Sequence, residues 1–152
     1  MTEYRQITAD EPEKIYIALS MLDKACVGAD GWSEASFRSE CAKDNGIVLA
    51  AFEDGELAGL LSGYTAVGEA DITSVAVAPA FRRMGIAREL VERFEAMLPE
   101  DTEGIFLEVR ASNAGAIALY EKCGFEQLSV RSRFYSSPEE DALVMKKELR
   151  KG

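Results

Sequence analysis

A short basic turn between a strand and a helix is the first stretch where the residue types suggest chemistry. The turn carries Arg82, Arg83 and Arg88, and the helix that follows opens near Gly85. The first amides of a helix have no partner within it, and the aligned peptide dipoles place partial positive charge there. A glycine at this point leaves room for an anion to reach those amides. The turn therefore predicts a binding site for a ligand that carries pyrophosphate.

The charge of the whole chain makes this turn informative. The formal net charge is −10 at pH 7, yet no acidic residue occurs from residue 72 to residue 88. The alternative is an ordinary turn whose arginines face solvent. The acidic balance argues against broad nucleic-acid binding and fits a basic protein or a polyamine as partner, although solubility alone would also explain it.

Acid–base chemistry in this chain must use groups other than imidazole, because the sequence contains no histidine. A carboxylate is one of the remaining bases, and Glu108 is the leading candidate. It lies mid-strand, on the face opposite an apolar row, where an acidic side chain costs free energy unless water or a partner reaches it. That apolar row is Ile105, Leu107 and Val109. The alternatives are pairing with Arg110 or exposure to solvent.

Tyr120 is the candidate proton donor, because its phenol precedes the charged end of a predicted helix. Alternatively its ring packs against Ile117 and its hydroxyl bonds the backbone. Cys123 has no basic neighbour except Lys122, so a nucleophilic role is not expected. Three cysteines without a Cys-x-x-Cys pair predict neither a metal site nor a disulfide framework.

Strands and helices must position these groups. Alternating and β-branched apolar runs predict strands at 4–7, 47–52, 57–64, 69–77, 105–110, 125–134 and 142–149. Helical spacing predicts helices that carry Ile15, Leu19 and Leu22, then Phe37 and Cys41, then residues 86–98, and then Ile117 to Tyr120. This order predicts an α/β (α+β) fold with a mixed sheet of about seven strands and about four helices on both faces.

Turn and cap residues mark the boundaries of these elements. Asp54 and Gly55 predict a tight hairpin turn, and Gly28 to Gly31 a loop. Residues 8–10 are expected to cap the first helix, Ser33 the second and Asn113 the last, which Gly124 ends.

Length and composition indicate one globular domain that spans residues 1–152, since 47% of the residues are hydrophobic. No apolar run approaches the ~20 residues that a membrane span needs, and the N-terminus lacks the apolar core of a signal peptide. We expect a cytoplasmic protein without a membrane partner, as a monomer or weak dimer.

Two segments resemble the GNAT superfamily of N-acetyltransferases. Arg82-x-x-Gly85-x-Ala87, after Val75-Ala-Val, is similar to its acetyl-CoA-binding motif. Residues 107–125 read Leu-Glu-Val-Arg-Ala-Ser-Asn-Ala-Gly-Ala-Ile-Ala-Leu-Tyr-Glu-Lys-Cys-Gly-Phe and closely resemble the signature of the RimI-like ribosomal-protein-alanine N-acetyltransferases. Trp32-Ser33-Glu34 and residues 140–145 are also similar to that family. The resemblance covers almost the whole chain.

The resemblance implies that acetyl-CoA is the co-substrate and that no metal is needed. In the family, the strands that match 69–77 and 105–110 splay apart, and the pantetheine arm pairs with the open strand at Val75 and Val77. The pyrophosphate would lie on residues 82–87. The expected acetyl-CoA-binding residues are Val75, Ala76, Val77, Arg82, Arg83, Met84, Gly85, Ile86, Ala87, Arg88 and Asn113.

The resemblance also implies roles in the reaction. Glu108 would be the general base and Tyr120 the general acid that protonates the coenzyme A thiolate, with direct transfer and no acyl-enzyme. An N-terminal α-amine has a pKa near ~7.7–8.0, against ~10.4 for lysine, so a carboxylate suffices as base for an N-terminal acceptor.

The acceptor is the open part of this hypothesis. Trp32, Glu34 and Tyr135 are the candidate substrate-binding residues, because a carboxylate with aromatic rings suits a basic peptide N-terminus. Alternatively, Trp32 is a core residue and Tyr135 an aromatic residue on an edge strand. The sequence also departs from the family: Gly31 replaces the usual proline before Trp-Ser-Glu, and residues 131–136 lose the asparagine and the final proline of Arg-x-Asn-Tyr-Tyr-Pro.

Three functions follow from these residues. The first is acetylation of a protein N-terminus, expected to be an alanine of a small-subunit ribosomal protein, with no direct nucleic-acid partner. The second is acetylation of a small amine, a polyamine or a lysine side chain. The third is an acyl-CoA-binding module without turnover, against which the presence of both Glu108 and Tyr120 weighs.

Overall fold

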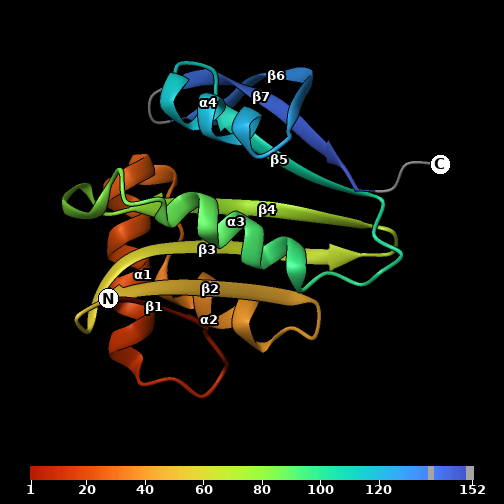
Figure 1. The fold of residues 1–152 in the computed structure, drawn as a ribbon. Helices are drawn as coiled ribbons and strands as arrows, with labels where there is room; N and C mark the ends of the chain where they lie inside the picture. Colours follow the sequence, from red (N-terminus) through yellow and green to blue (C-terminus); the bar gives the residue numbers. More distant parts are fainter. Residues whose placement is uncertain (137–138, 150–152) are drawn as a thin grey trace.

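A seven-stranded sheet runs through the whole molecule in the order β1-β2-β3-β4-β5-β7-β6 (Figure 1). The computed structural model describes residues 1–136 and 139–149. The strands are β1 (Thr2–Gln6), β2 (Gly46–Glu53), β3 (Glu56–Ala66), β4 (Glu69–Val77), β5 (Gly104–Arg110), β6 (Glu126–Ser136) and β7 (Glu139–Glu148). The helices are α1 (Glu13–Val27), α2 (Glu34–Ala42), α3 (Ile86–Ala96) and α4 (Ala114–Lys122), with 3₁₀ turns η1 (Gly28–Asp30) and η2 (Pro79–Phe81). Neighbouring strands are antiparallel except β4 and β5, so the sheet is mixed, as predicted.

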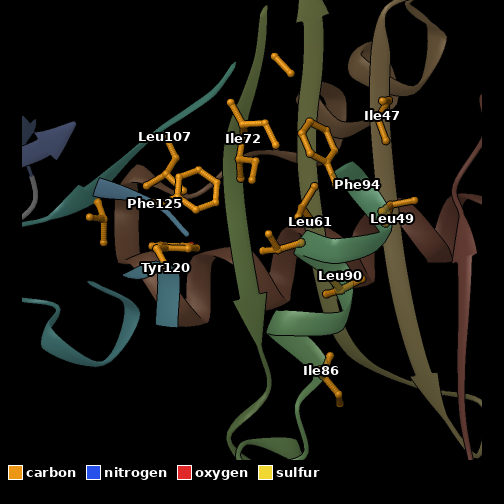
Figure 2. Packing of buried hydrophobic residues seen from close by; sticks show 14 of the residues in the cluster. Ile47, Leu49, Leu61, Ile72, Ile86, Leu90, Phe94, Leu107, Tyr120 and Phe125 are labelled. Atoms are coloured by element: carbon orange, nitrogen blue, oxygen red, sulfur yellow. The ribbon is translucent and has the colours of Figure 1, made fainter. Parts of the chain in front are cut away.

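Helices cover both faces of the sheet, and this confirms the predicted architecture. On one face, the apolar side of α3 packs on the sheet through Ile86, Leu90 and Phe94, next to Tyr120 and Phe125 (Figure 2). On the other face, α1 and α2 form a second core whose members include Tyr16, Leu19, Phe37, Val48 and Leu60. The spacing of Ile86, Leu90 and Phe94 is that of one helix face, which is why the sequence pattern located α3.

Most predicted caps are confirmed. The Ser33 hydroxyl accepts a hydrogen bond from the amide of Ser36, and the Asn113 side chain accepts one from the amide of Ala116. The hairpin between β2 and β3 turns at Asp54 and Gly55, whose φ angles of 50° and 84° are both positive, as a primed turn requires.

The prediction for the start of α1 was wrong. Residues 8–10 do not cap this helix, which begins at Glu13 with Pro12 as its N-cap and no side-chain cap. The amide and hydroxyl of Thr8 instead donate to the Glu11 carboxylate. A proline disfavours helical backbone in the residue before it, so the helix cannot extend back through Glu11.

The strands β4 and β5 separate halfway along their length, as Figure 1 shows. They pair only from Glu69 with Gly104 to Ile72 with Leu107. Directly after this point, the register of β4 on β3 shifts, and Thr73 is the extra residue of a β-bulge between Ile72 and Ser74. A bulge bends and twists its strand, so β4 turns away from β5 and leaves its remaining edge open. The splay that the family resemblance implied is therefore confirmed.

Candidate active site

Two adjoining cavities, which share lining residues, lie where β4 and β5 separate. The first has a volume of about 540 Å³ and extends over the turn before α3. The second has a volume of about 450 Å³ and lies between α1, β5 and β6. The residues that line both cavities are Cys26, Val27, Val75, Asn113, Ala116 and Tyr120. A ligand that fills the first cavity therefore reaches the wall of the second.

The basic turn forms one end of the first cavity. Gly85 caps α3 with a φ of +77°, and a Cβ placed on it would meet no atom within 4 Å. Within the described part of the chain, the amides from residue 83 to residue 88 donate no hydrogen bond. Arg82, Arg83 and Arg88 line the same end. Unpaired amides, open space and cations together fit a diphosphate.

Three residues predicted in this turn have different surroundings. Ala87 lines the first cavity, as expected. Ile86 also lines it, although its side chain is buried in the core. The Met84 side chain is about half exposed and lies outside both cavities, so only its backbone belongs to the turn.

The open edge of β4 forms the side of the first cavity. The amide of Ala78 donates to the Ala58 carbonyl on β3 at 2.8 Å. Because successive residues of an antiparallel ladder point their amides and carbonyls to alternate sides, Ala76 also faces β3, and Val75 and Val77 face the cavity. The Val77 carbonyl already accepts from Nε of Arg82 at 3.2 Å and from Sγ of Cys26 at 3.6 Å. The polar groups of Val75 and the amide of Val77 remain directed at the open edge.

Glu108 lies on the wall of the second cavity, where β5 alternates as predicted between buried residues and partly exposed ones. Its side chain is 30% exposed, and its Oε2 accepts from Nη1 of Arg131 at 2.6 Å. The considered pairing with Arg110 is wrong, since Arg110 pairs with Asp30 and Glu140. The second oxygen, Oε1, has no partner among the described residues.

Tyr120 stands at the junction of the two cavities and is 7% exposed. Its ring meets the edge of Phe125 at a centroid distance of 5.9 Å. Burial raises the pKa of the phenol far above its ordinary value, so the hydroxyl stays protonated at physiological pH. No hydrogen bond joins this hydroxyl to another described residue, so it is free to meet a ligand.

The three predicted acceptor residues do not all reach the site. Trp32 and Tyr135 line the second cavity, and burial raises the pKa of Tyr135 to about 12. Trp32 also packs against the second core, with its ring 5.3 Å from that of Phe37, so it is both a core residue and a cavity wall. Glu34 lines neither cavity and instead pairs with Arg38 at 2.9 Å in the first turn of α2.

Comparison with known proteins gives this arrangement a family. Residues 6–125 match the model of the Acetyltransferase (GNAT) family, which is well over half of the chain. The chain belongs to the GNAT family. It is therefore an N-acetyltransferase that depends on acetyl-CoA.

Individual relatives place the chain within this family. The "[Ribosomal protein bS18]-alanine N-acetyltransferase" of Escherichia coli is 33% identical over 117 residues, which cover 75% of this chain and 78% of the relative. The "N-alpha-acetyltransferase RimI" of Mycobacterium tuberculosis is 32% identical over 128 residues, or 80% and 78%. The crystal structure of the E. coli ribosomal-protein-S18-alanine N-acetyltransferase superposes with a TM-score of 0.84 at 28% identity, covering 100% of this chain and 96% of that one.

Sequence reasoning missed several polar residues of this GNAT site. Asp23 is 1% exposed on α1; it accepts from the amide of Trp32 at 2.7 Å and from the Ser74 hydroxyl. Asp71 lies opposite Tyr64 in the β3–β4 register, and burial raises its pKa. All of these residues line the second cavity. The acidic Asp23 on the apolar stripe of α1, one turn after Leu19, was a signal that could have been used.

Within residues 1–136 and 139–149, each helix is too short or too polar to traverse a lipid bilayer.

Proposed function

We infer that this chain acetylates the N-terminal α-amine of a protein, and that alanine is the first residue of the acceptor. The observation that carries this function is the second cavity, because it places Glu108 and Tyr120 beside the open edge of β4. Relatives about one-third identical that are named for acting on the alanine of ribosomal protein bS18 support the same acceptor. A small-subunit ribosomal protein is the corresponding partner.

The first cavity is the proposed site for acetyl-CoA. Acetyl-CoA supplies the acetyl group as a thioester, which an amine can attack. The amides of residues 83–88 and the three arginines would hold its diphosphate, and Val75 and Val77 would pair with the amides of its pantetheine arm. Asn113 caps α4 and also lines both cavities, so it can cap the helix and contact acetyl-CoA at the same time.

Glu108 and Tyr120 then divide the proton transfers. Oε1 of Glu108 takes the proton that the acceptor amine must lose, directly or through one water molecule. The Tyr120 hydroxyl donates a proton to the departing sulfur, because burial keeps this phenol protonated. No covalent enzyme intermediate is required, since burial raises the pKa of Cys123 and leaves it a poor nucleophile.

The charge of the second cavity selects for a cationic acceptor. Its lining contains four carboxylates, namely Asp23, Asp30, Asp71 and Glu108, against the cation Arg110. Arg131 pairs with Glu108 from outside the lining, and carboxylates still outnumber cations there. This excess attracts a protonated amine and the basic residues that follow it. The same excess favours a polyamine, so acetylation of a polyamine is the second candidate function.

A panel of acceptors separates the two functions. The peptides are a basic sequence with a free N-terminal alanine and the same sequence with a blocked N-terminus and an internal lysine; spermidine is the third acceptor. Release of the coenzyme A thiol gives kcat/KM, and mass spectrometry locates the acetyl group. We expect kcat/KM to be about 100-fold higher for the free N-terminus, because far more of its amine is neutral near pH 7. Faster turnover of spermidine would favour the second function.

Substitution of Gly85 by alanine tests the anion site. We expect the Kd for acetyl-CoA to rise about tenfold, because the new Cβ enters the space beside the unpaired amides and disturbs charge-assisted hydrogen bonds worth ~1.5–3 kcal/mol each. The positive φ also strains the folded chain by about 1–2 kcal/mol. Isothermal titration calorimetry measures the affinity, and thermal unfolding measures the strain.

Gly55→Ala is the matched control for this measurement. Gly55 has a φ of +84°, and a Cβ on it would also meet no atom within 4 Å, but it lies in the β2–β3 hairpin outside both cavities. The same loss of stability is expected with an unchanged Kd. Equal effects of the two substitutions on Kd would show that strain, not the anion site, governs binding.

A further inference from the structure

The two places where the sequence departs from the RimI-like pattern meet in the structure. Gly31 follows η1 at the start of the connection to α2, and Ser136 ends β6 on the far side of the second cavity. Between them, the Ser136 hydroxyl donates to Oδ1 of Asp30 at 2.9 Å. A contact between residues 106 positions apart therefore joins Ser136, one variant position, to the residue directly before Gly31, the other.

Arg110 extends this contact into a network. Its Nη2 lies 2.9 Å from Oδ2 of Asp30, and its Nη1 lies 3.3 Å from Oε1 of Glu140 on β7. The guanidinium also lies over the ring of Tyr135, 4.3 Å from the centroid. Only 15% of the Arg110 side chain is exposed. We call these five residues the clasp: Asp30, Arg110, Tyr135, Ser136 and Glu140.

Each end of the clasp is itself held in place. The Glu140 carboxylate accepts from the Ser112 amide at 2.6 Å, and this contact with Ser112 lowers the pKa of Glu140, so it stays ionised. At the other end, a Cβ on Gly31 would lie 2.7 Å from Cα of Lys24. The segment after Asp30 thus lies too close to α1 for a larger residue, and a proline would not fit there. Glycine permits the close approach that brings Asp30 to Arg110.

Three clasp residues, Asp30, Arg110 and Tyr135, line the second cavity. Asp30 lines it from the α1–α2 side, Tyr135 from the β6 side, and Arg110 contacts both. No clasp residue lines the first cavity. A substitution in the clasp should therefore change the binding of the acceptor and leave the affinity for acetyl-CoA unchanged.

We propose that the clasp holds the two sides of the second cavity together, namely the α1–α2 connection and β6, and makes Asp30 and Arg110 determinants of acceptor specificity. With the two sides joined, the α-amine that ends a polypeptide chain reaches Glu108, whereas a lysine amine, whose polypeptide continues in both directions, does not. Arg110 is a positioning residue, since it acts through Tyr135 and Asp30. This inference rests on the proposed function.

The experiment compares the wild type with Asp30→Ala and Arg110→Met on the alanine-initiated peptide and on the blocked lysine peptide. In both variants we expect KM for the alanine peptide to rise about tenfold with little change in kcat. The ratio of kcat/KM between the alanine and lysine peptides should fall about tenfold, a change of about 1.4 kcal/mol. The Kd for acetyl-CoA should stay at its wild-type value. Asp30→Ala leaves the Arg110–Glu140 pair intact. It therefore tests the clasp even if Arg110→Met unfolds the protein.

Arg133→Gln is the control. Arg133 pairs with Glu139 in the same β6–β7 hairpin at 3.7 Å, both side chains are largely exposed, and neither lines a cavity. Its kinetics should match the wild type. If the wild type is active and Asp30→Ala has the same ratio of kcat/KM between the alanine and lysine peptides, the proposed role of the clasp is wrong. A wild type that does not acetylate the alanine peptide would instead overturn the proposed function.

Discussion

Glu108→Gln should lower kcat for the alanine-initiated peptide by about 10²–10³-fold, within the range for loss of a positioned general base. Glutamine keeps the shape of the side chain and still offers an oxygen to Arg131, so the wall of the second cavity should not collapse. It cannot take a proton from the acceptor amine. The Kd for acetyl-CoA should not change, because Glu108 lies outside the first cavity.

The pH dependence of this deficit distinguishes a base from a residue that only binds the acceptor. As pH rises through ~8, a growing fraction of an α-amine is neutral without help. The gap between wild type and Glu108→Gln should therefore narrow at alkaline pH. A gap that is constant with pH would indicate that Glu108 binds the acceptor and does not accept its proton.

Glu148→Gln is the control for Glu108→Gln. Glu148 is also a strand glutamate in an ion pair, with Nζ of Lys146 at 2.8 Å, but it lies on β7 outside both cavities. Removal of this largely exposed pair should not change turnover. Full activity of Glu108→Gln would end its assignment as the base.

The elements of this fold were predictable where one face of each is apolar. Ile86, Leu90 and Phe94 locate α3, and alternation locates β5, because burial on one side imposes these periods. The β-bulge at Thr73 was not visible in the same way. It depends on the register of β4 against β3, and a strand pattern contains no information about the register of its neighbour.

The site was predictable where local backbone makes it and obscure where distant segments meet. The basic turn is formed within residues 82–88, so its glycine, Gly85, and its arginines could be identified directly from the sequence. The partner of Glu108 could not be identified in this way. Arg131 lies on β6, and the contact between the two residues depends on the strand order β5-β7-β6, which is a tertiary feature. Glu34 was expected at the acceptor side, but its neighbour Arg38, one helical turn away, pairs with it outside the cavity.

Tyr120→Phe should lower kcat about 10²-fold, the lower range for a positioned proton donor. Phenylalanine retains the buried ring and its edge contact with Phe125, so stability and acetyl-CoA affinity should change little. A general acid must be protonated to act. Burial raises the pKa of this phenol above its ordinary ~10, so titration of Tyr120 should not reduce the wild-type rate below about pH 10.

Tyr4→Phe is the control for the loss of a tyrosine hydroxyl outside the proposed active site. Burial also raises the pKa of Tyr4, and its ring lies under the Arg93 guanidinium at 4.4 Å, but it is on β1 outside both cavities. Its removal should leave kcat unchanged. If Tyr120→Phe alone slows turnover, and does so by the same factor at pH 7 and pH 9, the donor is a group that stays protonated over that range. Wild-type turnover in Tyr120→Phe would show that solvent protonates the thiolate.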